Sequence, residues 1–271
     1  MSDSVISRSF LDSSEIDEVR RLQKECPEGD RLQLNYHTMS RPGDGDDHFL
    51  WLRDGVLVGY AGLSHYCPEE VEVMCMVHPL HRRQGIASNM LARVMDVSRD
   101  RGFSRMLLVS EVGSESGQAF VRGSGRLAFT EHLLRSEPSS LRPASSEIVI
   151  DELPLGSIAE IEGIMLQSFG EIIEKPTARR FVGRLDGRAV GMMDVDIVDG
   201  EAYLSGFAVL PLERGKGYGR QILSAMTYLL RDEGVDTIKI EVETQNRRAL
   251  DLYLSSGFRP VTSYDYFEIL L

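Results

Sequence analysis

The sequence predicts an α+β fold built twice, as two tandem domains that each contain a mixed, mostly antiparallel sheet flanked by helices. Three observations predict this fold. The chain matches itself without a gap when it is shifted by 132 residues, which brings Pro79 onto Pro211. In each copy, short strand-like runs precede a glycine-containing loop and an amphipathic helix. A chain of 271 residues is long for one domain and suits two.

The repeat extends over most of a domain rather than over one motif. The shift matches Phe49 with Phe181, Asp54-Gly55 with Asp186-Gly187, Val58-Gly59 with Val190-Gly191, Val77 with Val209, Arg82 with Arg214, Gly85 with Gly217 and Gly125 with Gly257. We therefore predict one domain at 1–135 and a second at 147–271. The Ser- and Pro-rich segment at 136–146 has little to bury and is predicted to be an extended linker.

Local patterns in the second copy predict the order of its elements. Apolar and polar residues alternate at 147–153, as in a half-buried strand, and Ile222 and Met226 share one helix face. Asp-Gly turns separate neighbouring strands, and Gly257 suits the position after a helix. The predicted elements are a strand at 147–153, a helix at about 158–168, three strands within 179–210 with turns at 186–187 and 199–200, a helix at 217–234, a strand at 237–244, a short helix at 246–257 and final strands up to Tyr266.

Composition excludes several classes of protein. The net charge of −12 disfavours nucleic acid as a partner and weakly favours a cationic acceptor. Three cysteines without a CxxC pair indicate reduced thiols and a cytoplasmic protein, and six histidines without paired spacing predict no metal site. The N-terminus does not resemble a signal peptide, and no apolar run approaches the ~20 residues of a membrane span.

The loop after the third strand predicted within 179–210 has the sequence PLERGKGYGR and carries glycine at every second position from Gly215 to Gly219. Gly215, Gly217 and Gly219 let the backbone approach a ligand closely, and the loop leads into a helix whose first amides and dipole favour an anion. Basic residues add positive charge at Arg214, Lys216 and Arg220. We therefore expect a diphosphate ligand, with a glycine-rich turn that binds nothing as the alternative.

Two other diphosphate-binding families fit the loop poorly. A Walker A loop requires GxxxxGK[ST], whereas Lys216 is followed by Gly217, so no hydroxyl is available for a metal. A dinucleotide loop requires GxGxxG near the start of a doubly wound sheet, whereas this loop follows three hairpin-linked strands. Glu243 could mimic the ribose-binding acid of dinucleotide sites, but the last glycine spacing differs.

The run V-x-P-x-x-R-x-x-G-x-G at 209–219 resembles motif A of the GCN5-related N-acetyltransferases. The run NRRALDLYLSSGF at 246–258 resembles motif B of the same family, N-x-x-A-x-x-x-Y-x-x-x-G-F. The two motifs occur in the family's order, with the expected helix and strand between them. The resemblance covers the chain from about Glu147 onward, and the repeat extends it to the first copy.

This resemblance implies a tandem acetyltransferase that uses acetyl-coenzyme A and an amine acceptor. It implies that the loop amides bind the diphosphate and that a splay between the preceding strand and the next admits the cofactor. It also implies that the end of the preceding strand pairs with the pantetheine arm and that a motif-B asparagine lies along that arm. The corresponding residues here are Arg214, Gly215, Lys216, Gly217, Tyr218, Gly219 and Arg220 for the loop, Phe207, Ala208 and Val209 for the strand end, and Asn246 for the asparagine.

Tyr253 matches the tyrosine that protonates the departing thiolate in this family. The leaving thiolate has a parent thiol with a pKa of roughly 8.5, and a phenol with a pKa of about 10 can hydrogen-bond to its sulfur and protonate it as charge develops. Ala249 shares its helix face and is small enough to leave room for the cofactor. A backbone N–H near Val209 is the expected oxyanion donor. A half-buried core aromatic is the alternative interpretation of Tyr253.

The attacking amine must also lose a proton. Glu201 is the predicted general base, because the family often uses a carboxylate on the strand before the loop, and it has a counterpart in Glu69. Asp194 and Asp196 on the preceding strand also qualify. For each of them, a solvated turn acid is the alternative interpretation.

The first copy keeps the loop but not the predicted acid. Val77, Arg82, Gly85 and Ala87 preserve the spacing, so this copy is predicted to be able to bind coenzyme A. The aligned positions of Asn246, Ala249 and Tyr253 hold Ser114, Gly117 and Val121, and several glycines weaken any helix there. Because valine cannot donate a proton, we expect this half to be inactive or slower.

Three classes of function remain for the whole chain. The first is an N-acetyltransferase that acts on a primary amine of an unidentified small molecule or peptide. The second is a non-catalytic acyl-coenzyme A sensor or interaction module, which could lose Tyr253 and Asn246. The third is a nucleotide-dependent oxidoreductase, which the glycine spacing disfavours. The sequence does not identify the acceptor, and it allows a monomer or a homodimer.

Overall fold

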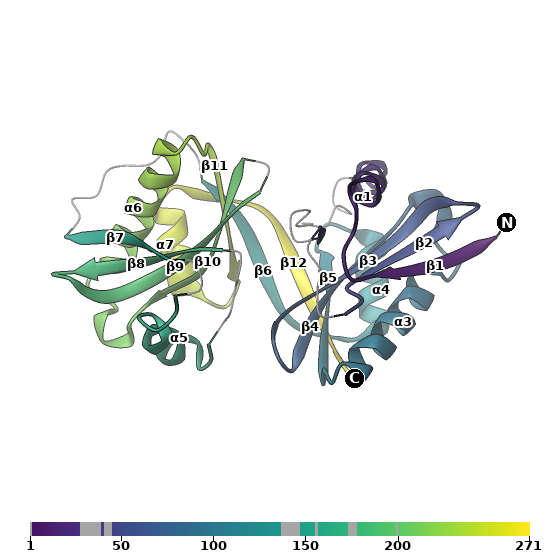
Figure 1. The fold of residues 1–271 in the computed structure, drawn as a ribbon, viewed down its shortest axis with the longest axis horizontal. Helices are drawn as coiled ribbons and strands as arrows, with labels where there is room; N and C mark the ends of the chain where they lie inside the picture. The colour runs from purple at the N-terminus through teal and green to yellow at the C-terminus, as the bar shows by residue number, and fades with distance from the viewer. Residues whose placement is uncertain are drawn as a thin grey trace. The chain divides into compact units, whose positions relative to one another are not determined.

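The computed structural model describes residues 2–27, 39–40, 45–136, 147–154, 157–172, 178–198 and 200–271, without the side chains of Tyr66 and Cys67. The chain forms two compact units (Figure 1). The first unit contains Met1–Thr130 together with Thr262–Leu271, and the second unit contains Glu131–Val261. Apart from Ser136, the predicted linker lies outside the described residues, as does Asp199 of one predicted turn.

The first unit is a mixed sheet with the strand order β1-β2-β3-β4-β5-β12. Neighbouring strands are antiparallel except β4 and β5, which are parallel. Its elements are β1 (Asp3–Arg8), α1 (Ser13–Glu25), β2 (His48–Arg53), β3 (Val56–Cys67), β4 (Glu70–Val77), α3 (Ile86–Asp100), β5 (Arg105–Glu111), α4 (Glu115–Ser124) and the start of β6 (Arg126–Ser136).

The second unit has the corresponding strand order β7-β8-β9-β10-β11-β6, with β10 and β11 as its parallel pair. Its elements are β7 (Ile148–Leu153), α5 (Glu162–Phe169), β8 (Arg179–Leu185), β9 (Arg188–Val198), β10 (Glu201–Val209), α6 (Tyr218–Asp232), β11 (Thr237–Glu243), α7 (Arg247–Ser255) and the start of β12 (Phe258–Leu270). The predicted final strands are thus one long strand.

The predicted internal repeat and the α+β class are confirmed. Helix α3 begins and ends 132 residues before α6, and β5 begins and ends 132 residues before β11. Both predicted strand-loop-helix arrangements are present, since a single 3₁₀ turn joins β4 to the loop before α3 and β10 to the loop before α6. In the part of the chain that the structure describes, no helix is long and apolar enough to cross a membrane.

Helices cover both faces of each sheet. In the second unit, α6 buries Ile222, Met226 and Leu230 on one face, and α5 buries Ile164 and Met165 on the other. In the first unit, α3 and α1 take the corresponding places, with buried apolar residues at Ile86, Met90 and Val94 in α3 and at Val19 and Leu22 in α1. The apolar faces at helical spacing explain why these segments fold as helices against the sheets.

The two copies exchange their final strands, which the sequence did not reveal. The end of β6, from Glu131 to Arg135, pairs antiparallel with β11 in the second unit. The end of β12, from Tyr264 to Leu270, pairs antiparallel with β5 in the first unit. The second unit is therefore completed by residues 131–135, which follow the first copy in sequence, and the first unit by residues 262–271, which follow the second copy. The predicted boundaries place 131–135 in the first domain and 262–271 in the second.

Helix α4 forms although its sequence carries several glycines. Ser114 caps it by accepting a hydrogen bond from the Gly117 N–H at 2.9 Å. A Cβ at position 117 would lie 2.5 Å from Ser110 Oγ and 2.6 Å from Ser114 Oγ, so the close packing of α4 on β5 requires glycine there. The glycine that weakens the isolated helix is thus what allows this helix to dock.

Candidate active site

The predicted splay between β10 and β11 opens at the end of β10. The two strands pair from Glu201 with Thr237 to Leu204 with Ile240, and β10 then continues to Val209. Pairing of β10 with β9 shifts by one residue between Ser205 and Ala208, which is a β-bulge. Gly206 has a φ of +55° within it. Bulges bend a strand and often occur beside active sites, and this one directly follows the last pair of β10 with β11.

The glycine loop has the geometry of an anion site. Gly215 and Gly217 have φ values of +84° and +87°, which favour glycine. Gly217 precedes the first turn of α6 and provides no side-chain cap. The amides of that turn have no partners within the helix, so they and the helix dipole are directed at the space in front of the loop.

The three basic side chains of the loop bind the protein rather than extend freely. Arg214 Nε donates to the Val209 carbonyl at 2.9 Å, Lys216 Nζ donates to Glu213 Oε2 at 2.9 Å, and Arg220 Nη2 donates to Ser255 Oγ at 2.7 Å. Lys216 and Arg188 hold the pKa of the buried Glu213 carboxyl below its usual range. These contacts fix the loop, so its backbone amides are the groups best placed for a phosphate.

A pocket of about 630 Å³ in the second unit brings most of the predicted site together. The predicted residues that line it are Phe207, Ala208, Val209, Arg214, Gly215, Gly217, Gly219, Arg220, Asn246 and Tyr253. Lys216 and Tyr218 do not line the pocket, since Lys216 binds Glu213 and Tyr218 packs against the apolar core. Asn246 also caps α7, because its Oδ1 accepts the Ala249 N–H at 3.2 Å.

Tyr253 reaches this pocket from α7. Its side chain is 5% exposed, and its ring lies 6.3 Å from the Phe207 ring and 6.1 Å from the Phe258 ring, between centroids. Burial raises the pKa of the phenol, so the hydroxyl is protonated at neutral pH. Among the described residues we find no hydrogen-bond partner for that hydroxyl, so it is available to donate to a ligand.

Sequence reasoning missed several other groups of the pocket, among them Arg248, Ser168 and Phe169. Arg248 lines it, with Nη2 3.8 Å from where a Cβ on Gly215 would lie, and has no ion-pair partner among the described residues. The arginine pair that directly follows Asn246 in the sequence could have pointed to Arg248. Ser168 and Phe169, at the end of α5, also line the pocket, and the Ser168 Oγ is buried without a hydrogen-bond partner in the described part of the chain. No motif marked these two.

Glu201 is the predicted catalytic residue that the structure does not bring to the pocket. It is the first residue of β10, whereas Val209 is the last, and its carboxylate accepts a hydrogen bond from Lys239 Nζ at 2.6 Å. Asp194, the alternative on β9, is 1% exposed and bound by Arg180 Nε at 2.8 Å. The sequence already places Glu201 at the start of this strand, and the pocket lies at the strand's other end, which is why the choice of Glu201 does not fit this geometry.

Replacing Gly206 by alanine is expected to weaken both folding and activity. A Cβ there would lie 3.0 Å from Asp194 Oδ2, and the positive φ adds strain of about 1–3 kcal/mol. We expect a lower free energy of unfolding and a reduced kcat, because the bulge shapes the strand end at the pocket. Chemical denaturation and a turnover assay measure the two effects.

Gly187→Ala is the matched control, since Gly187 has a φ of +78° but nothing within 4 Å of its added Cβ. Equal effects of both substitutions on stability and turnover would show that the bulge has no special role.

The first unit has a matching loop and a pocket of about 510 Å³. Arg83 and Gly85 have φ values of +63° and +80°, at the positions of Gly215 and Gly217. Arg82 Nε donates to the carbonyl of Val77, the last residue of β4, at 2.9 Å, as Arg214 does at the end of β10. Each predicted residue of this copy lines the pocket, namely Val77, Arg82, Gly85 and Ala87.

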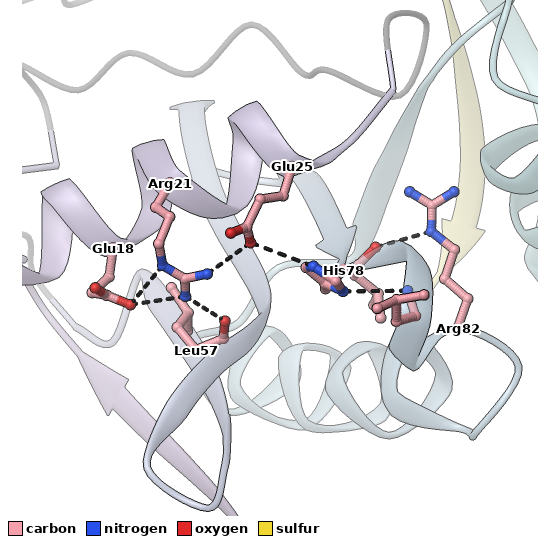
Figure 2. A network of polar contacts seen from close by, with 8 residues as sticks. Glu18, Arg21, Glu25, Leu57, His78 and Arg82 are labelled. Carbon is pink, nitrogen blue, oxygen red and sulfur yellow. Dashed lines mark hydrogen bonds and ion pairs between the residues drawn. The ribbon is translucent and has the colours of Figure 1, made fainter.

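A polar network ties α1 to the start of this loop (Figure 2). Arg21 donates to Glu18 and Glu25 and to the Leu57 carbonyl, the last at 2.9 Å. Glu25 lies 3.4 Å from His78 Nε2, and His78 Nδ1 accepts the Leu80 N–H at 3.2 Å. The end of α1 is thereby held against the residues that lead into the loop, so this wall of the first pocket is fixed.

The first unit differs from the second at the two features that matter for chemistry. Pairing of β3 with β4 continues without a shift from Ser64 with Glu72 to Gly59 with Val77, so β4 has no bulge at the position of Gly206. Val121, which is 2% exposed, takes the place of Tyr253.

Comparison with known proteins identifies a single family in both copies. A family model described as "Acetyltransferase (GNAT) family" matches residues 16–124 and 148–258. The mycothiol acetyltransferase of Actinosynnema mirum is 26% identical over 92% of this chain and 93% of its own length. The uncharacterized N-acetyltransferase YobR of Bacillus subtilis is 27% identical over 45% of this chain, which spans about half (49%) of that protein.

Solved structures show the same fold at low sequence identity. A GCN5-related N-acetyltransferase from Sphaerobacter thermophilus has a TM-score of 0.80 at 16% identity and covers 98% of this chain and 95% of its own. A tandem GNAT protein from the clavulanic acid biosynthesis pathway has a TM-score of 0.72 at 13% identity and covers 99% of this chain and 98% of its own.

Proposed function

Since this chain belongs to the acetyltransferase (GNAT) family, we propose that its second unit transfers an acetyl group from acetyl-coenzyme A to the primary amine of a small molecule or peptide. One observation carries this proposal. The glycine loop at the start of α6 and the buried phenol of Tyr253 line the same pocket, at the splayed end of β10.

The pocket suits coenzyme A in shape and charge. The diphosphate matches the amides of the first turn of α6, with Arg248 as a nearby cation that has no ion-pair partner among the described residues. Pantetheine fits the splay, where β10 from Phe207 to Val209 is no longer paired with β11. Bound there, acetyl-coenzyme A would supply an activated acyl group, and Phe207 and Tyr253 line the same pocket with ring centroids 6.3 Å apart.

The chain's contribution is to orient the thioester and supply a proton. The amine nitrogen forms a bond to the thioester carbonyl carbon, the carbon–sulfur bond breaks, and the sulfur takes the proton of the Tyr253 hydroxyl. The raised pKa of that phenol keeps the proton in place until the thiolate forms. The amine releases its own proton to water, and Glu201 has no part in this proposal because its ion pair with Lys239 holds it elsewhere.

A small-molecule acceptor is favoured over a peptide. The relatives named mycothiol acetyltransferase include one that covers 92% of this chain, whereas the relative named as a ribosomal protein bS18 alanine acetyltransferase covers 34%. We therefore propose a mycothiol-type amine as the first acceptor to test. The first unit is proposed to be non-catalytic, because it lacks the bulge and the phenol.

Thiol release from acetyl-coenzyme A in the presence of a panel of primary amines tests this function. We expect release that requires an amine, and we expect Gly219→Trp to abolish it, because the indole would occupy the space between Val209 and Leu252. Leu212→Trp is the control, since Leu212 lies in the same loop, is 85% exposed and does not line the pocket. Equal turnover of Gly219→Trp and the control would place the donor site elsewhere.

A further inference from the structure

The two pockets differ in their lining at one pair of matched positions. In the second unit these positions hold Phe207 and Tyr253, whose rings are tilted toward each other with centroids 6.3 Å apart. Of the described residues that line this pocket, none comes from β11. The two aromatic side chains therefore close the pocket before it reaches the neighbouring strand, which leaves room beyond the thioester for only a small acyl group.

In the first unit the same two positions hold Cys75 and Val121. With these smaller side chains the pocket continues to β5, where Leu108 and Val109 line it, and to Cys26 after the end of α1. The loop that would hold the diphosphate has positive φ values at the same two positions, Arg83 and Gly85. The first pocket, of about 510 Å³ against about 630 Å³ for the second, is thus smaller overall, but it reaches β5, whereas no described residue of β11 lines the second.

Leu108 and Val109 make the part of the pocket along β5 apolar, as far as Ser110 and Glu111 at the end of that strand. Burial raises the pKa of the Cys75 thiol to about 12, so the thiol is neutral. The polar groups nearby are satisfied within the protein, since Ser114 Oγ accepts the Gly117 N–H at 2.9 Å and Ser110 Oγ donates to the Glu111 carbonyl at 3.3 Å. An alkyl chain is the ligand group that complements such a surface, and each methylene it buries strengthens binding by up to about fourfold.

We propose that the first unit is a binding site for an acyl-coenzyme A whose acyl chain is longer than acetyl, held between β4 and β5 without being transferred. The proposal rests on the proposed function in one respect, since it takes the glycine loop as a coenzyme A site. The ligand stays intact because the unit has neither the phenol of Tyr253 nor the bulge of β10.

Calorimetric titration of the full chain with coenzyme A, acetyl-coenzyme A and hexanoyl-coenzyme A, without an amine, tests this proposal. We expect one site to bind hexanoyl-coenzyme A at least about tenfold more tightly than acetyl-coenzyme A. Hydrogen exchange should show that hexanoyl-coenzyme A protects residues 105–111 and 118–124. The double substitution Cys75→Phe/Val121→Tyr, which installs the residues of the second unit, should reduce this preference to less than about threefold.

The reciprocal change, Phe207→Cys/Tyr253→Val, is the matched variant and should create a second site that prefers hexanoyl-coenzyme A. Equal affinity for the hexanoyl and acetyl thioesters in the unaltered chain would overturn the proposal. Protection confined to 249–256 would overturn it too, and this measurement needs no variant to fold. Either of these two results, together with intact acetyl transfer, rejects this inference alone. Failure of coenzyme A itself to bind rejects the proposed function as well.

Discussion

Replacing Tyr253 by phenylalanine is expected to lower kcat for acetyl transfer by about 10²–10⁴, because the departing thiolate loses its proton donor. The change removes one hydroxyl and keeps the ring between Phe207 and Phe258, so the fold and the affinity for acetyl-coenzyme A should hardly change. Single-turnover kinetics and calorimetric titration separate the two quantities. Tyr228→Phe, on the exposed side of α6, is the control and should leave kcat unaltered.

The pH profile gives a second readout of the same group. An acid must be protonated to act, so kcat falls as pH rises through its pKa. Because burial raises the pKa of Tyr253 above its ordinary value of about 10, this fall should lie above pH 10. Loss of activity below pH 9 that disappears in Tyr253→Phe would contradict the raised pKa, and unchanged kcat in that variant would remove Tyr253 from the mechanism.

Deleting residues 262–271 is expected to unfold the first unit, although those residues follow the second copy in sequence. The segment pairs with β5 and buries Tyr264, Tyr266 and Phe267, each of which contributes about 1.5–3 kcal/mol on burial. That sum approaches the whole stability of a typical domain, about 5–15 kcal/mol. Hydrogen exchange of β3, β4 and β5 before and after the deletion measures the effect.

Single substitutions provide a finer test of the same strand. Phe267→Ala should lower the free energy of unfolding by about 3–5 kcal/mol, whereas Val261→Ala, at a residue that is 56% exposed, should have little effect. If the shortened chain still protects β5 from exchange, the first unit does not depend on β12.

The sequence allowed prediction of those features that local residues determine. Glycines at fixed offsets revealed the repeat and the two loops, and motif B identified Tyr253, which lies in the same pocket as the loop. Strand exchange could not be predicted, because alternation of apolar residues does not say which distant strand a segment pairs with. The bulge at Gly206 and the ion pair of Glu201 with Lys239 depend on neighbouring strands in the same way.

The exchange of the ends of β6 and β12 also determines which unit can be completed first during protein synthesis. The residues that complete the first unit are translated only after the whole of the second copy, whereas 131–136 are already available when β11 emerges. The half of the polypeptide that leaves the ribosome first is therefore finished last. Until then it exposes the open edge of β5, a surface that a nascent chain needs to shield from other strands.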